Sequence, residues 1–183
     1  MAHTCPWWLA YTFDNRLRQL MHSPEKVLSP YISPGMTVMD VGCGMGHFSI
    51  GMAGLVGDNG LVISVDLQEE MLEVVQRRAE KVGVSQRIRT YQCTPDGIGD
   101  HKNVDFALAF WMVHEVQETN LFFEQIRSSL TNQGMLLVAE PRFHVSAKHF
   151  KELMNGAENS GLRLCEEPLV RFSRAALFSR DGI

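Results

Sequence analysis

The chain has 183 residues, of which 45% are hydrophobic and 21% charged, and its formal net charge is −4 with histidine neutral. This length is typical of one domain with a sizeable core, and the composition excludes fibrous, disordered and disulfide-scaffold proteins. The slightly acidic balance lacks the basic surface of nucleic-acid-binding proteins, so we expect no nucleic-acid partner.

The apolar runs are strand-length, far below the ~20 residues that cross a bilayer, and the amino terminus has no signal-peptide pattern. The cysteines form no C-x-x-C pair, which indicates reduced thiols rather than a disulfide or zinc framework. We therefore expect a cytoplasmic protein that does not bind membranes. The cysteines are Cys5, Cys43, Cys93 and Cys165.

Short β-branched runs alternate with helical patterns along the chain, which is typical of βαβ units and a parallel sheet. No repeat or linker divides it, so we expect a single domain over residues 1–183, with a helical segment (1–34) before the core (35–183). The predicted strands are residues 37–41, 61–66, 88–92, 104–113, 135–140, 162–166 and 175–179, and the predicted helices are 24–33, 47–56, 68–82, 119–130 and 146–160.

The most informative segment is VMDVGCGMGHF, where Asp40 near a strand end precedes Gly42, Gly44 and Gly46 and then a helix. Glycine at alternate positions lets a tight turn bring its backbone close to a ligand, and the helix start adds free N–H groups. Asp66 ends the second strand, where a carboxylate can accept hydrogen bonds from both hydroxyls of a ribose. The pattern predicts a nucleoside-containing cofactor.

A nicotinamide dinucleotide is the competing cofactor, but its G-x-G-x-x-G fingerprint does not match, because the third glycine comes one residue early. The spacing instead resembles the D/E-x-G-x-G-x-G hallmark of class I S-adenosylmethionine-dependent methyltransferases. The resemblance implies a Rossmann-like three-layer α/β sandwich whose seven-stranded, mostly parallel sheet has an antiparallel last strand. It also implies S-adenosylmethionine as the methyl donor and S-adenosylhomocysteine as its product.

The resemblance further implies a role for each matching residue. The glycine loop would contact the methionine part of the cofactor, Asp66 would hold the ribose, and the residues after Asp66 would border the adenosine. Cys93 and Thr94 stand where the family often has an acidic residue for the adenine. The implied cofactor-binding residues are Asp40, Gly42, Cys43, Gly44, Gly46, Asp66, Leu67, Gln68, Met71, Cys93, Thr94 and Phe110.

Three shorter motifs resemble a group of small methyltransferases within the same superfamily, which also includes quinone-biosynthesis and other small-molecule enzymes. The chain opens with C-P-W-W-L at Cys5–Leu9, carries H-E-V at His114–Val116 and has E-P-x-x-H-V at Glu140–Val145. The N/D-P-P-Y/F signature of enzymes that methylate amino groups in nucleic acids is absent. We therefore expect a small-molecule methyl acceptor.

The acceptor is expected beyond the carboxyl ends of the fourth and fifth predicted strands, where ligands bind in open α/β sheets. His114 or His144 could act as a general base, and Glu140 could orient the imidazole. Trp111 and Glu115 are candidate acceptor-binding residues. Trp7 and Trp8 belong to an aromatic amino-terminal cluster that could form a lid or pack on the sheet edge.

Other functions stay open at this point. His114, Glu115, Glu140 and His144, with Cys5, could ligate a divalent ion, but no recognised ligand spacing supports it, so we expect no metal. A thiol or metalloid acceptor, or a non-catalytic module that binds S-adenosylmethionine as a sensor or partner subunit, also fits the sequence. The oligomeric state is not predicted.

Overall fold

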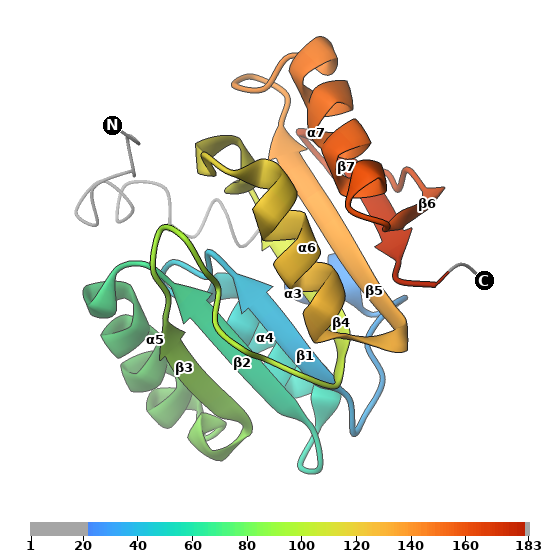
Figure 1. Cartoon of the computed structure of the whole chain (residues 1–183). Helices are drawn as coiled ribbons and strands as arrows, with labels where there is room; N and C mark the ends of the chain where they lie inside the picture. The colour runs from blue at the N-terminus through green and yellow to red at the C-terminus, as the bar shows by residue number, and fades with distance from the viewer. Residues whose placement is uncertain (1–21, 182–183) are drawn as a thin grey trace. The chain divides into compact units, whose positions relative to one another are not determined.

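The computed structural model describes residues 22–181, and these fall into two compact units, residues 22–94 and 95–181 (Figure 1). Trp7, Trp8 and Cys5, and with them the proposed lid, lie outside the described residues. Of the predicted amino-terminal helical segment, the structure describes helix α3 (Pro24–Leu28), which is shorter than the predicted helix over residues 24–33.

In residues 22–94, three parallel strands alternate with helices. Strand β1 pairs with β2, and β2 pairs with β3, each in parallel. Helix α4 packs on β1 and β2, whereas α5 packs on β2 and β3. The elements are β1 (Thr37–Val41), α4 (His47–Val56), β2 (Leu61–Asp66), α5 (Glu69–Val82), the short 3₁₀ helix η1 (Ser85–Arg87) and β3 (Ile88–Gln92).

In residues 95–181, β4 and β5 are parallel, and β7 runs antiparallel to both β5 and β6. Helices α6 and α7 lie side by side against these strands (Figure 1). The elements are β4 (Val104–Phe110), the 3₁₀ helix η2 (Val113–Glu115), α6 (Thr119–Ser129), β5 (Leu130–Pro141), α7 (Ala147–Asn159), β6 (Arg163–Glu166) and β7 (Ser173–Ser179).

The strand order within the described residues is β3-β2-β1-β4-β5-β7-β6, a seven-stranded sheet. The parallel strands, the flanking helices and the antiparallel β7 confirm the predicted Rossmann-like α/β fold. Strand β4 is buried along almost its whole length, as its apolar sequence predicted for a central strand. Among residues 22–181, no helix has the length and apolar character needed to cross a bilayer.

Two predicted strand boundaries were wrong by three residues or more. The strand expected over residues 104–113 ends at Phe110, because Trp111 has a positive φ of 61° that turns the chain out of the strand. The strand expected to begin at residue 135 begins at Leu130, so Gly134 lies within a strand. A Cβ at Gly134 would lie 2.8 Å from the Val104 carbonyl oxygen, so glycine serves close strand approach there.

Candidate active site

The glycine loop joins β1 to α4 through three glycines with positive φ, 66° at Gly42, 52° at Gly44 and 78° at Gly46. Residues that carry a Cβ rarely adopt a positive φ, so the chain can form this turn because glycine occupies these positions. The N–H groups of Gly42 and Cys43 both donate to the Val65 carbonyl oxygen, at 2.8 and 3.0 Å. The loop is thereby fixed to the end of β2.

Asp66 ends β2 and lies against this loop. Its Oδ2 accepts the Gly44 N–H at 2.8 Å, and its Oδ1 accepts the Gln68 N–H at 3.0 Å. Burial raises the pKa of the Asp66 carboxyl, an effect that the backbone N–H groups partly oppose. The structure therefore brings the predicted ribose-binding carboxylate into direct contact with the predicted cofactor loop.

Gly44 and Gly46 differ in the space around them. A Cβ at Gly44 would meet no atom of residues 22–181 within 4 Å, whereas a Cβ at Gly46 would lie 2.9 Å from Cγ2 of Val75 on α5. Each Asp66 oxygen has two lone pairs, so the carboxylate can accept further hydrogen bonds besides those it makes. Open space beside Gly44 and this spare capacity at Asp66 fit a nucleoside cofactor.

Asp40 is almost fully buried at 2% exposure. Its Oδ2 accepts the Ser49 hydroxyl at 2.6 Å, and Ser49 in turn accepts the Ser64 hydroxyl at 2.9 Å. These bonds tie β1, α4 and β2 together beneath the loop sequence. Direct contact of Asp40 with the cofactor stays a prediction.

The other predicted cofactor residues in this unit follow the ends of β2 and β3. The Cys93 N–H donates to the Asp66 carbonyl at 2.9 Å, and the Gln92 side chain donates to the Leu67 carbonyl at 3.2 Å. Met71 is buried, Leu67 and Gln68 are half-buried, and Thr94 is exposed. The structure thus gathers Leu67, Gln68 and Cys93 around Asp66.

The thiols of Cys43 and Cys93 are held in their protonated form. Burial, together with the charges of Asp40 and Asp66, raises the pKa of Cys43 well above its usual value. Burial and Asp66 raise the pKa of Cys93 to about 11. Because the thiolate is the reactive form, neither group is poised as a nucleophile or soft ligand.

In residues 95–181, His114 on η2 pairs with Glu140 near the end of β5. The side chain of Glu140 is fully buried, and its Oε2 makes a hydrogen bond with Nδ1 of His114. Its Oε1 accepts the Val113 N–H at 2.8 Å. The carboxylate therefore fixes both the backbone of η2 and the orientation of the imidazole.

Burial acts to lower the pKa of His114, but the hydrogen bond and charge of Glu140, aided by Glu115, outweigh it and raise this pKa. Nε2 of His114 lies 4.0 Å from Oε1 of Glu115. The ring of His144 packs edge-on at 4.8 Å between centroids. Four predicted acceptor-side residues thus lie together.

Trp111 lies next to this cluster. Its N–H donates to the Ala139 carbonyl at 2.7 Å, and its indole N–H donates to the Ser173 hydroxyl at 2.9 Å. The Trp111 ring stacks on the Phe110 ring and contacts the Phe143 ring edge-on, and the ring centroids are 5.5 Å apart in each pair. Two contacts of Trp111 were not predicted from the sequence: Ser173 belongs to no local motif, and Phe143 is a variable position within the E-P-x-x-H-V motif.

Among the described residues, no three His, Cys, Asp or Glu side chains are arranged to hold a metal ion. The groups that converge within residues 95–181 are instead an imidazole, a buried carboxylate and aromatic rings. Such a set can hold a flat or apolar molecule and accept a proton.

A family model described as a methyltransferase domain matches residues 32–169. The chain belongs to this methyltransferase family. This agrees with the methyltransferase superfamily that the glycine motif predicted, and the family and fold imply use of S-adenosylmethionine. The chain spans less than two thirds of the length of the curated relatives it matches.

In sequence, this methyltransferase is 23% identical over 135 residues to a probable cobalt-precorrin-6B C(15)-methyltransferase (decarboxylating) from Thermoplasma acidophilum, a match that covers 74% of this chain and 65% of the relative. Its fold resembles that of an S-adenosylmethionine-dependent methyltransferase from Aquifex aeolicus, with a TM-score of 0.85 and 24% identity over 96% of this chain and 98% of the other.

A putative rRNA-methylase from Clostridium thermocellum also shares the fold, with a TM-score of 0.67 and 15% identity over 91% of this chain and 97% of the other. At such identities the structural likeness shows the fold alone. The absence of a nucleic-acid partner therefore stays a prediction.

Proposed function

We propose that this methyltransferase transfers a methyl group from S-adenosylmethionine to the hydroxyl group of a small molecule. The observation that carries the proposal is the His114–Glu140 pair, in which a buried carboxylate holds one imidazole nitrogen. Methyl transfer to a hydroxyl needs a group that removes the proton, and a histidine oriented by a carboxylate is suited to that task.

The cofactor is assigned to the glycine loop and Asp66. When bound, S-adenosylmethionine supplies a methyl carbon that is activated by its sulfonium sulfur. Asp66 would accept hydrogen bonds from the ribose hydroxyls, and Gly44 would allow the close approach that a side chain would block. Leu67, Gln68 and Cys93 would border the nucleoside.

His114 is assigned as the general base. When Nδ1 carries the proton and donates to Glu140, Nε2 has a free lone pair and can accept the proton of the acceptor hydroxyl. The deprotonated acceptor oxygen would then take the methyl group that bound S-adenosylmethionine supplies. Glu140 stabilises the imidazolium that forms.

His144 and Trp111 are assigned to acceptor binding. The His144 ring contacts the His114 ring, and Trp111 presents an aromatic surface that is extended by Phe143. Aromatic faces stack on flat apolar molecules, so this wall favours an acceptor with a planar or conjugated part. The acidic net charge, and the cobalt-precorrin named as substrate of the Thermoplasma acidophilum relative, support a small-molecule acceptor over nucleic acid.

Incubation with methyl-labelled S-adenosylmethionine and separate metabolite, protein and RNA fractions tests the proposal. We expect label in a metabolite, in an amount equal to the S-adenosylhomocysteine formed, and in a linkage stable to mild base, as an ether is. Label in RNA or protein would contradict a small-molecule acceptor. Tight cofactor binding without any transfer would favour a non-catalytic module.

A further inference from the structure

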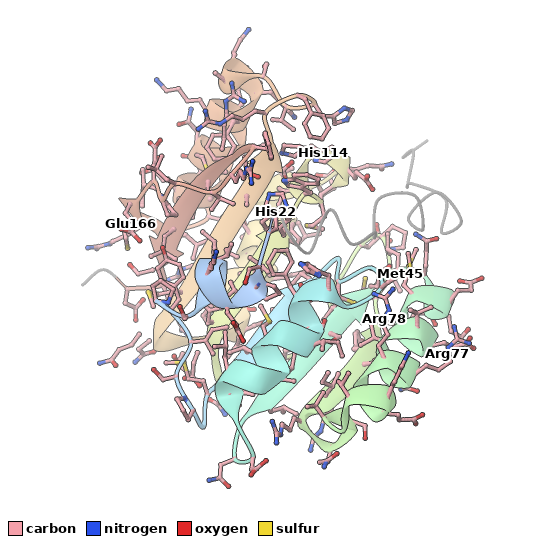
Figure 2. The ribbon with its side chains drawn as sticks, turned by 180° about the vertical axis from the view of Figure 1, so that it is seen from behind. His22, Met45, Arg77, Arg78, His114 and Glu166 are labelled. Carbon is pink, nitrogen blue, oxygen red and sulfur yellow. The ribbon has the colours of Figure 1, made fainter. Side chains whose placement is uncertain are left out.

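Helix α5 contacts the glycine loop through an arginine that the sequence motif does not include. Nη1 of Arg78 donates to the Met45 carbonyl oxygen at 2.9 Å, and Nη2 lies 3.9 Å from the Met45 sulfur (Figure 2). The two residues are separated by 33 positions in the chain. The guanidinium therefore holds the carbonyl of Met45, the residue between Gly44 and Gly46.

Helix α5 also restricts Gly46, the residue after Met45, by steric contact. Val75, one turn before Arg78, leaves no room for a Cβ at Gly46, whose φ is 78°. Met45 itself is 4% exposed, so its carbonyl is set in a largely buried part of the loop. A buried carbonyl that loses its donor costs free energy or forces the backbone to turn elsewhere.

We propose that Arg78 is a positioning residue for cofactor binding, which holds the Met45 peptide so that Gly44 keeps the conformation that admits the cofactor. This inference rests on the proposed use of the glycine loop for S-adenosylmethionine. Asp66 fixes the N–H of Gly44 and Arg78 fixes the carbonyl of Met45, so the loop is held from β2 and from α5. Loss of one anchor lowers the fraction of molecules in the binding-competent form, and the apparent affinity falls in proportion.

Arg77 provides a matched control on the same helix. Its side chain is exposed, and it makes no hydrogen bond or ion pair with the described residues. Arg78→Met and Arg77→Met remove the same charge from adjacent positions and leave side chains of the same length. A difference between these variants therefore reports the contacts of Arg78 and not the net charge of α5.

The experiment measures the dissociation constant of S-adenosylhomocysteine by calorimetry for wild type, Arg78→Met, Arg78→Lys and Arg77→Met, together with urea unfolding without ligand. We expect about tenfold weaker binding for Arg78→Met, the loss of about one charge-assisted hydrogen bond. Arg77→Met should bind as wild type does. Arg78→Lys should be several-fold weaker than wild type, because lysine lacks the planar fork.

Hydrogen exchange of the peptide that contains residues 42–47 separates positioning from general stability. In Arg78→Met this peptide should exchange faster while β1 and β2 keep wild-type protection, a pattern that uniform destabilisation would not give. Equal affinities of Arg78→Met and Arg77→Met would overturn the inference. Should Arg78→Met fail to fold, wild-type affinity in Arg78→Lys would overturn it. If wild type itself binds no S-adenosylhomocysteine, the proposed function fails first.

Discussion

The main-chain N–H of Gly44 donates to Oδ2 of Asp66 at 2.8 Å, so a residue of the glycine loop is bonded to the carboxylate that we propose binds the ribose. Asp66 is 8% exposed, and its second oxygen accepts the Gln68 N–H. The carboxylate thus shapes the loop, and in the proposed function it would also bind the ribose. A change at either residue is expected to affect the other.

Asp66→Ala should weaken the binding of S-adenosylhomocysteine by about 1–3 kcal/mol, since hydrogen bonds to a charged group are lost. It should also lower the free energy of unfolding without ligand, because the Gly44 and Gln68 N–H groups lose their acceptor. Glu73→Gln, an exposed carboxylate change on α5, is the control and should alter neither quantity. Calorimetry and urea unfolding measure both, and unchanged affinity in Asp66→Ala would place the ribose elsewhere.

Gly44→Ala and Gly46→Ala should differ in how much they lower the stability of the protein. A methyl group at Gly44 would have no neighbour within 4 Å among the described residues, so we expect only the cost of a positive φ, about 1–2 kcal/mol, with cofactor binding lost. The methyl at Gly46 also overlaps Val75, which should add about 1–3 kcal/mol of destabilisation. Thermal unfolding and ligand titration distinguish these effects.

Gly54→Ala is the control for the two loop variants, because it lies inside α4 with open space around its Cβ. We expect it to raise stability by about 0.5–1 kcal/mol, as alanine does in a helix interior. If Gly44→Ala bound the cofactor as Gly54→Ala does, the loop would be an ordinary turn.

His114→Gln should lower the rate of methyl transfer by about 10²–10⁴-fold with little change in cofactor affinity, because a general base acts on the acceptor proton. Single-turnover transfer to the acceptor found in the metabolite screen measures this rate. His149→Gln, a change at an exposed histidine on α7, should transfer at the wild-type rate. A normal rate in the folded fraction of His114→Gln would leave the pair with a structural role only.

The pH dependence follows from the raised pKa of His114. The base must be neutral, so kcat/KM should rise with pH through a value above the ordinary histidine pKa of about 6.5. In Glu140→Gln the charge that raises the pKa of His114 is gone while burial remains, so the rise of kcat/KM should occur at lower pH. If kcat/KM rose over the same pH range in Glu140→Gln as in wild type, the assignment of His114 as the general base would be contradicted.

The free energy of unfolding should also depend on the His114–Glu140 pair, and the stabilisation that the pair provides should fall as pH rises. A group whose pKa is raised on folding contributes stability below its unfolded pKa and loses it as pH rises through the folded pKa. The difference in unfolding free energy between wild type and His114→Gln should therefore shrink above about pH 6.5. Urea titrations at several pH values measure this difference.

Local patterns predicted the glycine turn and the position of Asp66. The glycines at 42, 44 and 46 were predicted to turn because glycine adopts positive φ freely, and each has φ above 50°. Asp66 was predicted from its place at the end of a strand, and it lies against the loop. These features depend on neighbours in the sequence, so they are visible without a structure.

Pairings across the fold were harder to predict. The His114–Glu140 bond joins residues 26 positions apart, and it depends on the register of β4 against β5 and on the turn at Trp111. Arg78 offered a weak signal, since it follows Val75 by three positions on the buried face of α5, where a charged residue needs a partner. Its partner Met45 could not be deduced from spacing.

The most direct measurement of the central claim is a calorimetric titration of the wild-type protein with S-adenosylhomocysteine, S-adenosylmethionine and NAD in parallel. We expect micromolar binding of the first two, on the order of −8 kcal/mol, and no heat with NAD. Binding of NAD without binding of either S-adenosyl compound would contradict the assignment of the glycine loop and Asp66 to a methyl donor.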